Sequence, residues 1–216
     1  MNFAIIAQQL VSGMGSSLMI FVLTLLFSMP LGLLVAFGRM SKIKPLQAVI
    51  KVCIAILRGT PLMLQLLVVN FAPYYLFRIS LPRWYRFAAI IIGFSINYAA
   101  YFAEIYRSGI ESIPKGQYEA ASVLGYNKNQ TFFRIIFPQM VKRVLPPVTN
   151  EVITLVKDTS LAFVLAYEEM FTVAKQIASA RTSIMPLFVA GVFYFIFNAV
   201  VAFAMERIEK KLSYYH

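Results

Sequence analysis

The chain has 216 residues, of which 60% are hydrophobic and only 13% are charged, and its mean hydropathy is +0.72. A soluble domain is about 45–50% apolar and about 25% charged, so this chain cannot hide its apolar surface in a core of its own and a bilayer is the expected solvent. The net charge of +11 does not indicate a nucleic-acid partner, because no soluble basic domain is present to carry it, and the single cysteine excludes an intramolecular disulfide.

Five stretches are apolar over the roughly 20 residues that a membrane-spanning helix needs. They are residues 17–37, 48–71, 87–106, 145–166 and 186–205. Residues 2–12 come before the first of them and are expected to form a short interfacial helix rather than part of a span. The sequence therefore predicts an all-α integral membrane protein, a single domain over residues 1–216 with about five transmembrane helices.

The lysines and arginines predict the orientation of these spans. If the N-terminus lies outside, thirteen of the twenty fall in the inner loops and five in the outer ones, while Arg58 and Lys157 lie within spans. Positive charge accumulates on the cytoplasmic side of membrane proteins. We therefore expect the N-terminus outside and the C-terminus in the cytoplasm.

The second span is interrupted by a charge and by two helix breakers. Arg58 lies about ten residues into it, followed by Gly59 and Pro61. A charge within a span indicates a functional site by default, and broken helices build binding sites in transporters. Arg58 is therefore a candidate for binding a substrate carboxylate through two parallel hydrogen bonds.

A polar segment, residues 111–139, separates the third and fourth spans and is expected in the cytoplasm. Its pattern predicts a short helix, a turn and a second short helix. Pro114 can open the first helix, and Gly125 suits the position after its end. Asn127 is a candidate N-cap of the second helix, with Gln130 three residues later as in a capping box.

The first of these short helices carries little side-chain bulk. Glu119 stands beside Ala120 and Ala121, and Pro138 is expected to bend the chain into the fourth span. A compact helix of this kind fits a groove on another protein, but an amphipathic hairpin lying on the lipid would have a similar sequence. The residues alone leave both interpretations open.

Two carboxylates lie within the fourth span. Glu151 and Asp158 are seven residues apart, which places them on one face of a helix, and Thr159 and Ser160 add hydroxyl groups next to Asp158. This face is a candidate for binding an ammonium group. The alternatives are that both carboxylates form internal ion pairs with Arg58, or that the three charges serve as a gate.

The polar segment resembles the EAA loop of ATP-binding-cassette (ABC) importer permeases, whose pattern is E-A-A-x3-G-x9-I-x-L-P. The matching residues are Glu119, Ala120, Ala121, Gly125, Ile135 and Pro138, with Phe137 in place of the usual leucine. The segments RGTPLMLQL (58–66), AYFAEIYRSGIESIPKGQ (100–117) and NEVITLVKDTSLA (150–162) resemble the polar amino acid branch of that family. The resemblance covers about residues 15–212.

The resemblance implies a type I ABC importer permease fold in the bacterial plasma (inner) membrane. It implies that the loop forms coupling helices, which dock into a separate cytoplasmic ATPase and transmit its closing motion. The chain has no G-x-x-x-x-G-K-[ST] phosphate loop, so ATP and Mg²⁺ are expected to bind to that ATPase and not here. The other implied partners are a second permease subunit, identical or similar, and an external substrate-binding protein.

The resemblance and the charges together predict uptake of polar amino acids by alternating access. Two carboxylates against one arginine favour a basic substrate such as arginine, lysine or histidine, while glutamine or cystine remains an alternative. An ion-driven secondary transporter and a membrane scaffold without transport are the rival functions of another class. Neither a metal site nor a catalytic nucleophile with its base is predicted, so the chain is not expected to be an enzyme.

Overall fold

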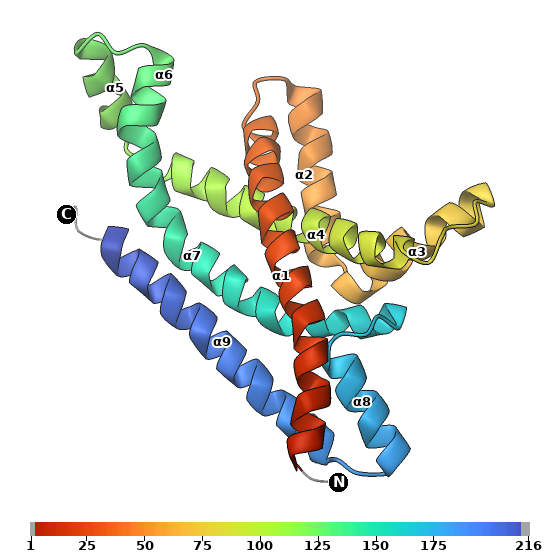
Figure 1. The fold of residues 1–216 in the computed structure, drawn as a ribbon. Coiled ribbons are helices and arrows are strands. Elements are labelled where there is room, and N and C mark those ends of the chain that lie inside the picture. Colours follow the sequence, from red (N-terminus) through yellow and green to blue (C-terminus); the bar gives the residue numbers. More distant parts are fainter. Residues whose placement is uncertain (1–2, 213–216) are drawn as a thin grey trace.

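The computed structural model describes residues 3–212, and over this range the chain is helical and has no strands (Figure 1). The α-helices are α1 (Phe3–Arg39), α2 (Lys44–Gly59), α3 (Leu62–Phe77), α4 (Tyr85–Glu111), α5 (Lys115–Val123), α6 (Lys128–Thr131), α7 (Phe137–Asp158), α8 (Met170–Arg181) and α9 (Met185–Leu212). A π-helix (Phe132–Ile136) joins α6 to α7, and a 3₁₀-helix (Thr159–Leu165) follows α7. The predicted all-α class is confirmed.

Helix α1 begins earlier than the sequence predicts. The expected interfacial helix at residues 2–12 is wrong for the part that the structure describes, because residues 3–12 continue without a break into the first span. Gly13 is not a helix breaker here. A Cβ atom at this position would lie 2.7 Å from the Cα of Met170, so glycine allows α1 to pack directly against the start of α8. Leu10 is fully buried in the same contact.

Helices α1, α4 and α9 are long and apolar enough to cross a membrane. Helices α2 and α3 together are apolar enough for a fourth span, but they bend by 110° where they meet. The predicted break after Arg58 is therefore confirmed. The predicted fourth span corresponds to α7 and the 3₁₀-helix, and α7 carries more charges than a typical lipid-exposed span. The count of five spans stays a prediction.

Helix α4 lies at the centre of the fold, and α1 crosses it with the most extensive contact between any two described helices (Figure 1). Small residues make this contact close. A Cβ at Gly32 of α1 would lie 2.8 Å from the Cβ of Phe102, and Ala99 and Ala103 of α4 are buried. Small residues at helix crossings are typical of membrane proteins, where close van der Waals packing drives association.

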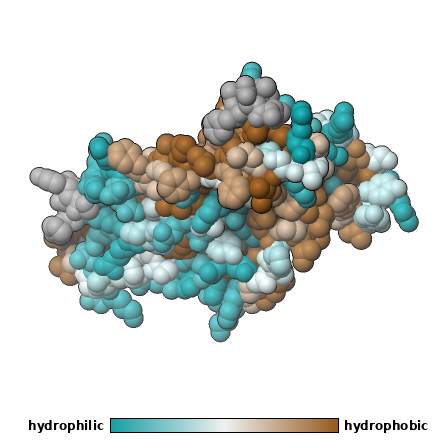
Figure 2. Space-filling model, turned by 90° about the horizontal axis from the view of Figure 1, so that it is seen from below, coloured by the Kyte–Doolittle hydropathy of each residue, from teal (hydrophilic) through white to brown (hydrophobic). Residues whose placement is uncertain are grey.

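The surface of the bundle separates into areas of different polarity. Viewed from the end at which α1 begins, hydrophobic residues gather along one edge and hydrophilic residues occupy much of the remaining surface (Figure 2). Helix α9 exposes large apolar side chains along its length. They include Val192, Phe195, Ile196, Val200 and Phe203. A helix with this much exposed apolar surface needs lipid or another membrane helix against it.

A buried carboxylate connects three helices at the end of the molecule where α1 begins. Glu169 is fully buried and caps α8, accepting hydrogen bonds from the backbone N–H groups of Phe171 (2.7 Å) and Thr172 (2.6 Å). The hydroxyl of Tyr194 on α9 donates to it at 3.0 Å, and the hydroxyl of Ser17 on α1 lies 3.4 Å away. The carboxylate also lies at the helix N-terminus, where negative charge is favourable. Glu169 therefore fixes α8 against α1 and α9.

We expect Glu169→Ala to destabilise the fold strongly. The substitution removes the cap and leaves buried donors on Thr172 and Tyr194 without a partner, at a cost of about 3 kcal/mol. In detergent, the apparent unfolding midpoint should fall by roughly 10 °C. The neighbouring Glu168 is exposed and serves as the matched control, so Glu168→Ala should leave the midpoint unchanged. Equal midpoints for the two variants would contradict this role.

Candidate functional site

The polar loop folds as the sequence predicts. Helix α5 begins directly after Pro114, and Gly125 adopts a φ of +75° beyond its end. Asn127 and Gln130 form the predicted capping box, in which each side chain accepts a hydrogen bond of 2.9 Å from the backbone N–H of the other residue. The loop projects from the bundle at the end opposite to the start of α1 (Figure 1).

The loop exposes a small apolar tip, formed by Val123 and Leu124. Val123 is 88% exposed and Leu124 is 73% exposed, both at the turn between α5 and α6. Glu119 and Ala120 are exposed on α5, whereas Ala121 is fully buried. Apolar side chains exposed to this degree in a polar loop indicate a binding surface. Small residues nearby, Ala120, Ala121 and Gly125, keep this apolar tip compact.

The chain does not break at Pro138, although a bend was expected there. It stays helical through Pro138, and the irregularity lies one turn earlier in the π-helix. Proline has no N–H group, and its ring would clash with the carbonyl four residues before it, that of Arg134. The wider π-helical turn, closed by a hydrogen bond from Phe137 N to Phe132 O, accommodates this carbonyl. Ile135 is half-buried in this turn.

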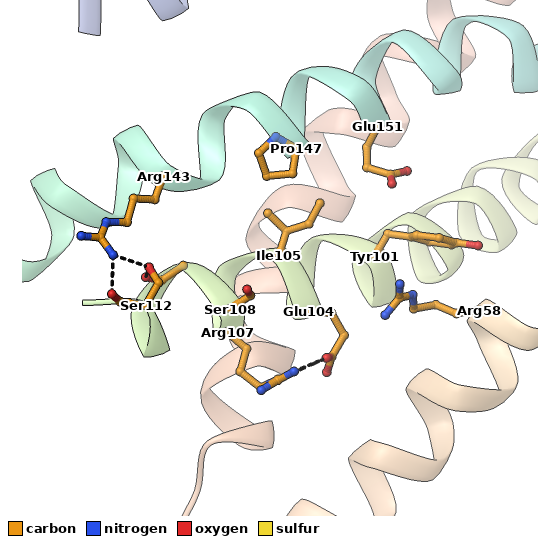
Figure 3. Close-up of a pocket in the computed structure, with 11 residues that line it drawn as sticks. Arg58, Tyr101, Glu104, Ile105, Arg107, Ser108, Ser112, Arg143, Pro147 and Glu151 are labelled. Carbon is orange, nitrogen blue, oxygen red and sulfur yellow. Dashed lines mark hydrogen bonds and ion pairs between the residues drawn. The ribbon is translucent and has the colours of Figure 1, made fainter. Parts of the chain in front are cut away.

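A cavity of about 500 Å³ lies between α2, α4 and α7 (Figure 3). It is lined by Arg58, Tyr101, Glu104, Ile105, Arg107, Ser108, Gly109, Ser112, Arg143, Pro147 and Glu151. Two of the predicted site residues, Arg58 and Glu151, therefore line the same space. Figure 3 shows their side chains coming from α2 and α7, with Tyr101 of α4 between them.

Most of the charges around the cavity are already paired. Arg107 contacts Glu104 at 2.6 Å and also pairs with Glu111. Arg39, at the end of α1, lies 3.7 Å from Glu104. Glu104 and Arg107 therefore form a local ion pair within α4. Arg143 donates hydrogen bonds to the backbone oxygen and the hydroxyl of Ser112, a contact that fastens α7 to the end of α4.

Arg58 and Glu151 differ from these pairs. The guanidinium of Arg58 lies over the ring of Tyr101, 5.1 Å from its centroid, and the side chain is exposed to the cavity. Among residues 3–212, no ion pair joins Arg58 to Glu151 or to Asp158, so the alternative of a direct pair does not hold in this structure. One positive and one negative charge are thus available to a bound molecule.

The remaining predicted residues lie outside the lining of the cavity. The carboxylate of Asp158 accepts a hydrogen bond of 2.7 Å from the hydroxyl of Tyr98. Thr159 is fully buried, and its hydroxyl donates to the carbonyl of Val156 at 2.8 Å. The hydroxyl of Ser160, in the 3₁₀-helix, donates to the carbonyl of Lys157 near the end of α7 at 2.8 Å. In this structure the side chains of these three residues form hydrogen bonds within the protein.

The sequence prediction missed the polar face of α4. Tyr101, Glu104, Ser108 and Ser112 all line the cavity. They recur every three or four residues from the third apolar stretch to the residue that caps the end of α4, which places them on one side of a helix. This periodicity is the signal that could have identified them. No comparable signal marks Arg143, whose contact with Ser112 joins residues 31 positions apart.

Known proteins resemble this chain over almost its whole length. Residues 28–214 match the family described as "Binding-protein-dependent transport system inner membrane component". The L-cystine transport system permease protein TcyB of Bacillus subtilis (strain 168) is 37% identical over 196 residues, which is 90% of this chain and 82% of TcyB. The arginine transport system permease protein ArtQ of the same organism is 30% identical, over 94% of this chain and 92% of ArtQ.

A solved structure has the same fold as this chain. The crystal structure of an amino acid ABC transporter with histidines contains a chain that superposes with a TM-score of 0.87 at 29% identity. The alignment covers 98% of this chain and 99% of that one. The fold is therefore shared with a chain of an amino acid ABC transporter over almost the whole length of both chains. The chain belongs to the inner-membrane permease subunits of ABC importers, in the family that transports polar amino acids.

Proposed function

We propose that the chain forms the translocation pathway of an ATP-driven amino acid importer and that its cavity binds the part common to all α-amino acids. The observation that carries this proposal is that Arg58 and Glu151 line one cavity without being paired to each other. An α-amino acid carries a carboxylate and an ammonium group on one carbon. Arg58 would bind the carboxylate and Glu151 the ammonium group.

This arrangement suits the cost of charges within a membrane. An unpaired charge inside a span costs about 3 kcal/mol on insertion scales and is normally compensated by a partner or by water. A zwitterionic substrate compensates Arg58 and Glu151 at the same time. A guanidinium binds a carboxylate through two parallel hydrogen bonds, which also fixes the direction of the substrate. Recognition of this kind fits relatives named for cystine and for arginine.

The preference for a basic side chain depends on Asp158 in this proposal. The hydroxyl of Tyr98 holds its carboxylate at 2.7 Å. A conformational change that separates α4 from α7 would release Asp158 as a second carboxylate for a substrate cation such as that of arginine, lysine or histidine. The adjacent hydroxyls of Thr159 and Ser160 would then lie along the route of the substrate. Glutamine or cystine, which lack a basic side chain of this kind, would not require Asp158 to separate from Tyr98.

The loop would couple the cavity to ATP hydrolysis. Val123 and Leu124 form the exposed tip that would enter a groove of the ATPase subunit. Glu119, Ala120, Ala121, Gly125, Ile135 and Pro138 would shape the helices behind it. ATP and Mg²⁺ would bind to that ATPase, and its closure would rock the spans by rigid-body motion. The proposal places the loop in the cytoplasm and the start of α1 outside, which agrees with their positions at opposite ends of the molecule.

The complete transporter would contain two permease subunits, two ATPase subunits and an external binding protein. The second permease, identical or similar, would cover the side on which Arg58 is exposed. The substrate would pass from the binding protein into the cavity when the pathway opens outward. Return to the inward-facing state would release it to the cytoplasm.

The test is uptake of labelled arginine and labelled cystine into proteoliposomes that contain this chain, its ATPase and its binding protein. We expect uptake to require ATP and to stop when the phosphate-loop lysine of the ATPase is replaced. Competition by lysine and histidine, and not by glutamine or cystine, would support release of Asp158 toward the substrate. Uptake that continues without ATP and follows an ion gradient would contradict the proposal and favour a secondary transporter.

A further inference from the structure

The break between α2 and α3 leaves backbone carbonyl groups at the end of α2 that need hydrogen-bond donors. Helix α2 ends at Gly59 and α3 begins at Leu62, with an angle of 110° between them. The last carbonyl groups of a helix have no partner within it. In a bilayer each unsatisfied carbonyl costs several kcal/mol, because no water is present to hydrogen-bond with it.

Gln65, on the first turn of α3, reaches back to the end of α2. Its Nε2 donates hydrogen bonds to the carbonyl oxygens of Leu57 (2.8 Å) and Thr60 (3.1 Å), and to the hydroxyl of Thr60 (2.9 Å). The same hydroxyl donates to the carbonyl of Ile56 at 2.8 Å. One side chain amide therefore holds the two halves of the broken helix at a defined angle.

A second amide joins this contact from α4. Asn97 is buried, with 4% of its surface exposed. Its Nδ2 donates to the carbonyl of Leu57 at 3.1 Å and to Oε1 of Gln65 at 3.0 Å. The carbonyl of Leu57 thus accepts from both amides. We call Gln65 and Asn97 the amide clamp.

We propose that the amide clamp positions Arg58 for carboxylate binding. The carbonyl of Leu57 belongs to the peptide group that enters Arg58, so fixing this carbonyl fixes the Cα from which the guanidinium extends. Tyr101, whose ring lies under the guanidinium, is four residues after Asn97 on α4. One helix therefore holds both the backbone and the side chain of Arg58. The inference rests on the proposed function, because it assumes that Arg58 binds the substrate carboxylate.

The clamp also explains why the side chains at these two positions are primary amides. The carbonyls of Leu57 and Thr60 need donors, and the contact between the two clamp residues needs one donor and one acceptor. A primary amide supplies both without adding a charge to the membrane interior. Methionine at position 65 would keep a similar volume but would leave the carbonyl of Thr60 without its donor. Leucine at position 97 would remove one of the two donors to the carbonyl of Leu57 and the donor that holds Oε1 of Gln65.

The test is equilibrium binding of labelled arginine to the complex of this chain with its ATPase in lipid nanodiscs, without the binding protein. We expect Asn97→Leu to weaken binding roughly 10-fold and Arg58→Leu roughly 30-fold, as for the loss of one neutral and of one charge-assisted contact. The double variant should bind about as weakly as Arg58→Leu alone, because the clamp acts through Arg58. Gln65→Met removes the clamp from the side of α3 and should behave like Asn97→Leu.

A ligand without a carboxylate separates positioning from a general loss of structure. Agmatine is arginine without its carboxylate, so Asn97→Leu should leave agmatine binding unchanged while weakening that of arginine. Asn198→Leu, which replaces another intramembrane asparagine on α9, is the matched control and should bind both ligands normally. Equal losses for the two ligands, or additive losses in the double variant, would overturn the clamp. Failure of the unaltered complex to bind any amino acid would overturn the proposed function and the clamp with it.

Discussion

Replacing Glu119 with lysine is expected to abolish ATP-driven uptake while the permease still folds. Glu119 is exposed on α5, close to the apolar tip formed by Val123 and Leu124. A lysine at this position would face groups of the ATPase that suit a carboxylate. The mismatch would reduce the binding free energy by about 2–5 kcal/mol. Such a loss lowers the affinity for the ATPase by roughly 30-fold or more. The measurement is uptake together with co-purification of the ATPase.

The control for this variant is a charge reversal at the other end of the molecule. Glu168 is exposed between the 3₁₀-helix and α8, far from the loop, so Glu168→Lys should leave binding of the ATPase intact. Leu124→Asp should reproduce the defect of Glu119→Lys, because it places a charge on the apolar tip. If Glu119→Lys keeps both uptake and its ATPase, the loop does not have the coupling role assigned to it.

Replacing Arg58 with leucine is expected to weaken amino acid binding to the permease strongly. The bound carboxylate would lose its two charge-assisted hydrogen bonds, worth about 1.5–3 kcal/mol, or roughly 10- to 100-fold in affinity. Arg58→Lys keeps the charge but cannot form the paired geometry, so it should recover only part of the loss. Titration calorimetry on the complex in nanodiscs measures both effects.

An arginine away from the cavity controls for the loss of positive charge. Arg83 is exposed in the segment between α3 and α4, and Arg83→Leu should leave the affinity unchanged. Glu151→Gln should weaken binding of amino acids to a similar extent as Arg58→Leu, because it removes the partner of the ammonium group. Normal affinity in both Arg58→Leu and Glu151→Gln would exclude the cavity as the substrate site.

The sequence was sufficient to predict the helix–turn–helix fold of the polar loop because the rules that shape it are local. The capping box joins residues three positions apart, and Gly125 marks the end of α5 through its own backbone conformation. The break after Arg58 was predictable for the same reason, since Gly59 and Pro61 disfavour a continuous helix. Each of these features depends on neighbours within one or two turns.

The cavity and the internal contacts could not be predicted in this way. Tyr98 and Asp158 are 60 residues apart, and Ser17 and Glu169 are 152 residues apart. Their pairing depends on how the helices cross, which composition and periodicity do not define. The start of α1 illustrates the same limit, because the close packing of Gly13 against Met170, 157 positions later, depends on the fold and not on neighbours in the sequence.

The most direct test of the central claim is a structure of the permease–ATPase complex with a bound amino acid, determined by electron cryomicroscopy. We expect density in the cavity between α2, α4 and α7. The carboxylate should lie about 3 Å from the guanidinium of Arg58, and the ammonium group should lie at a similar distance from Glu151. An amino acid bound elsewhere, or bound here in the opposite direction, would contradict the roles proposed for Arg58 and Glu151.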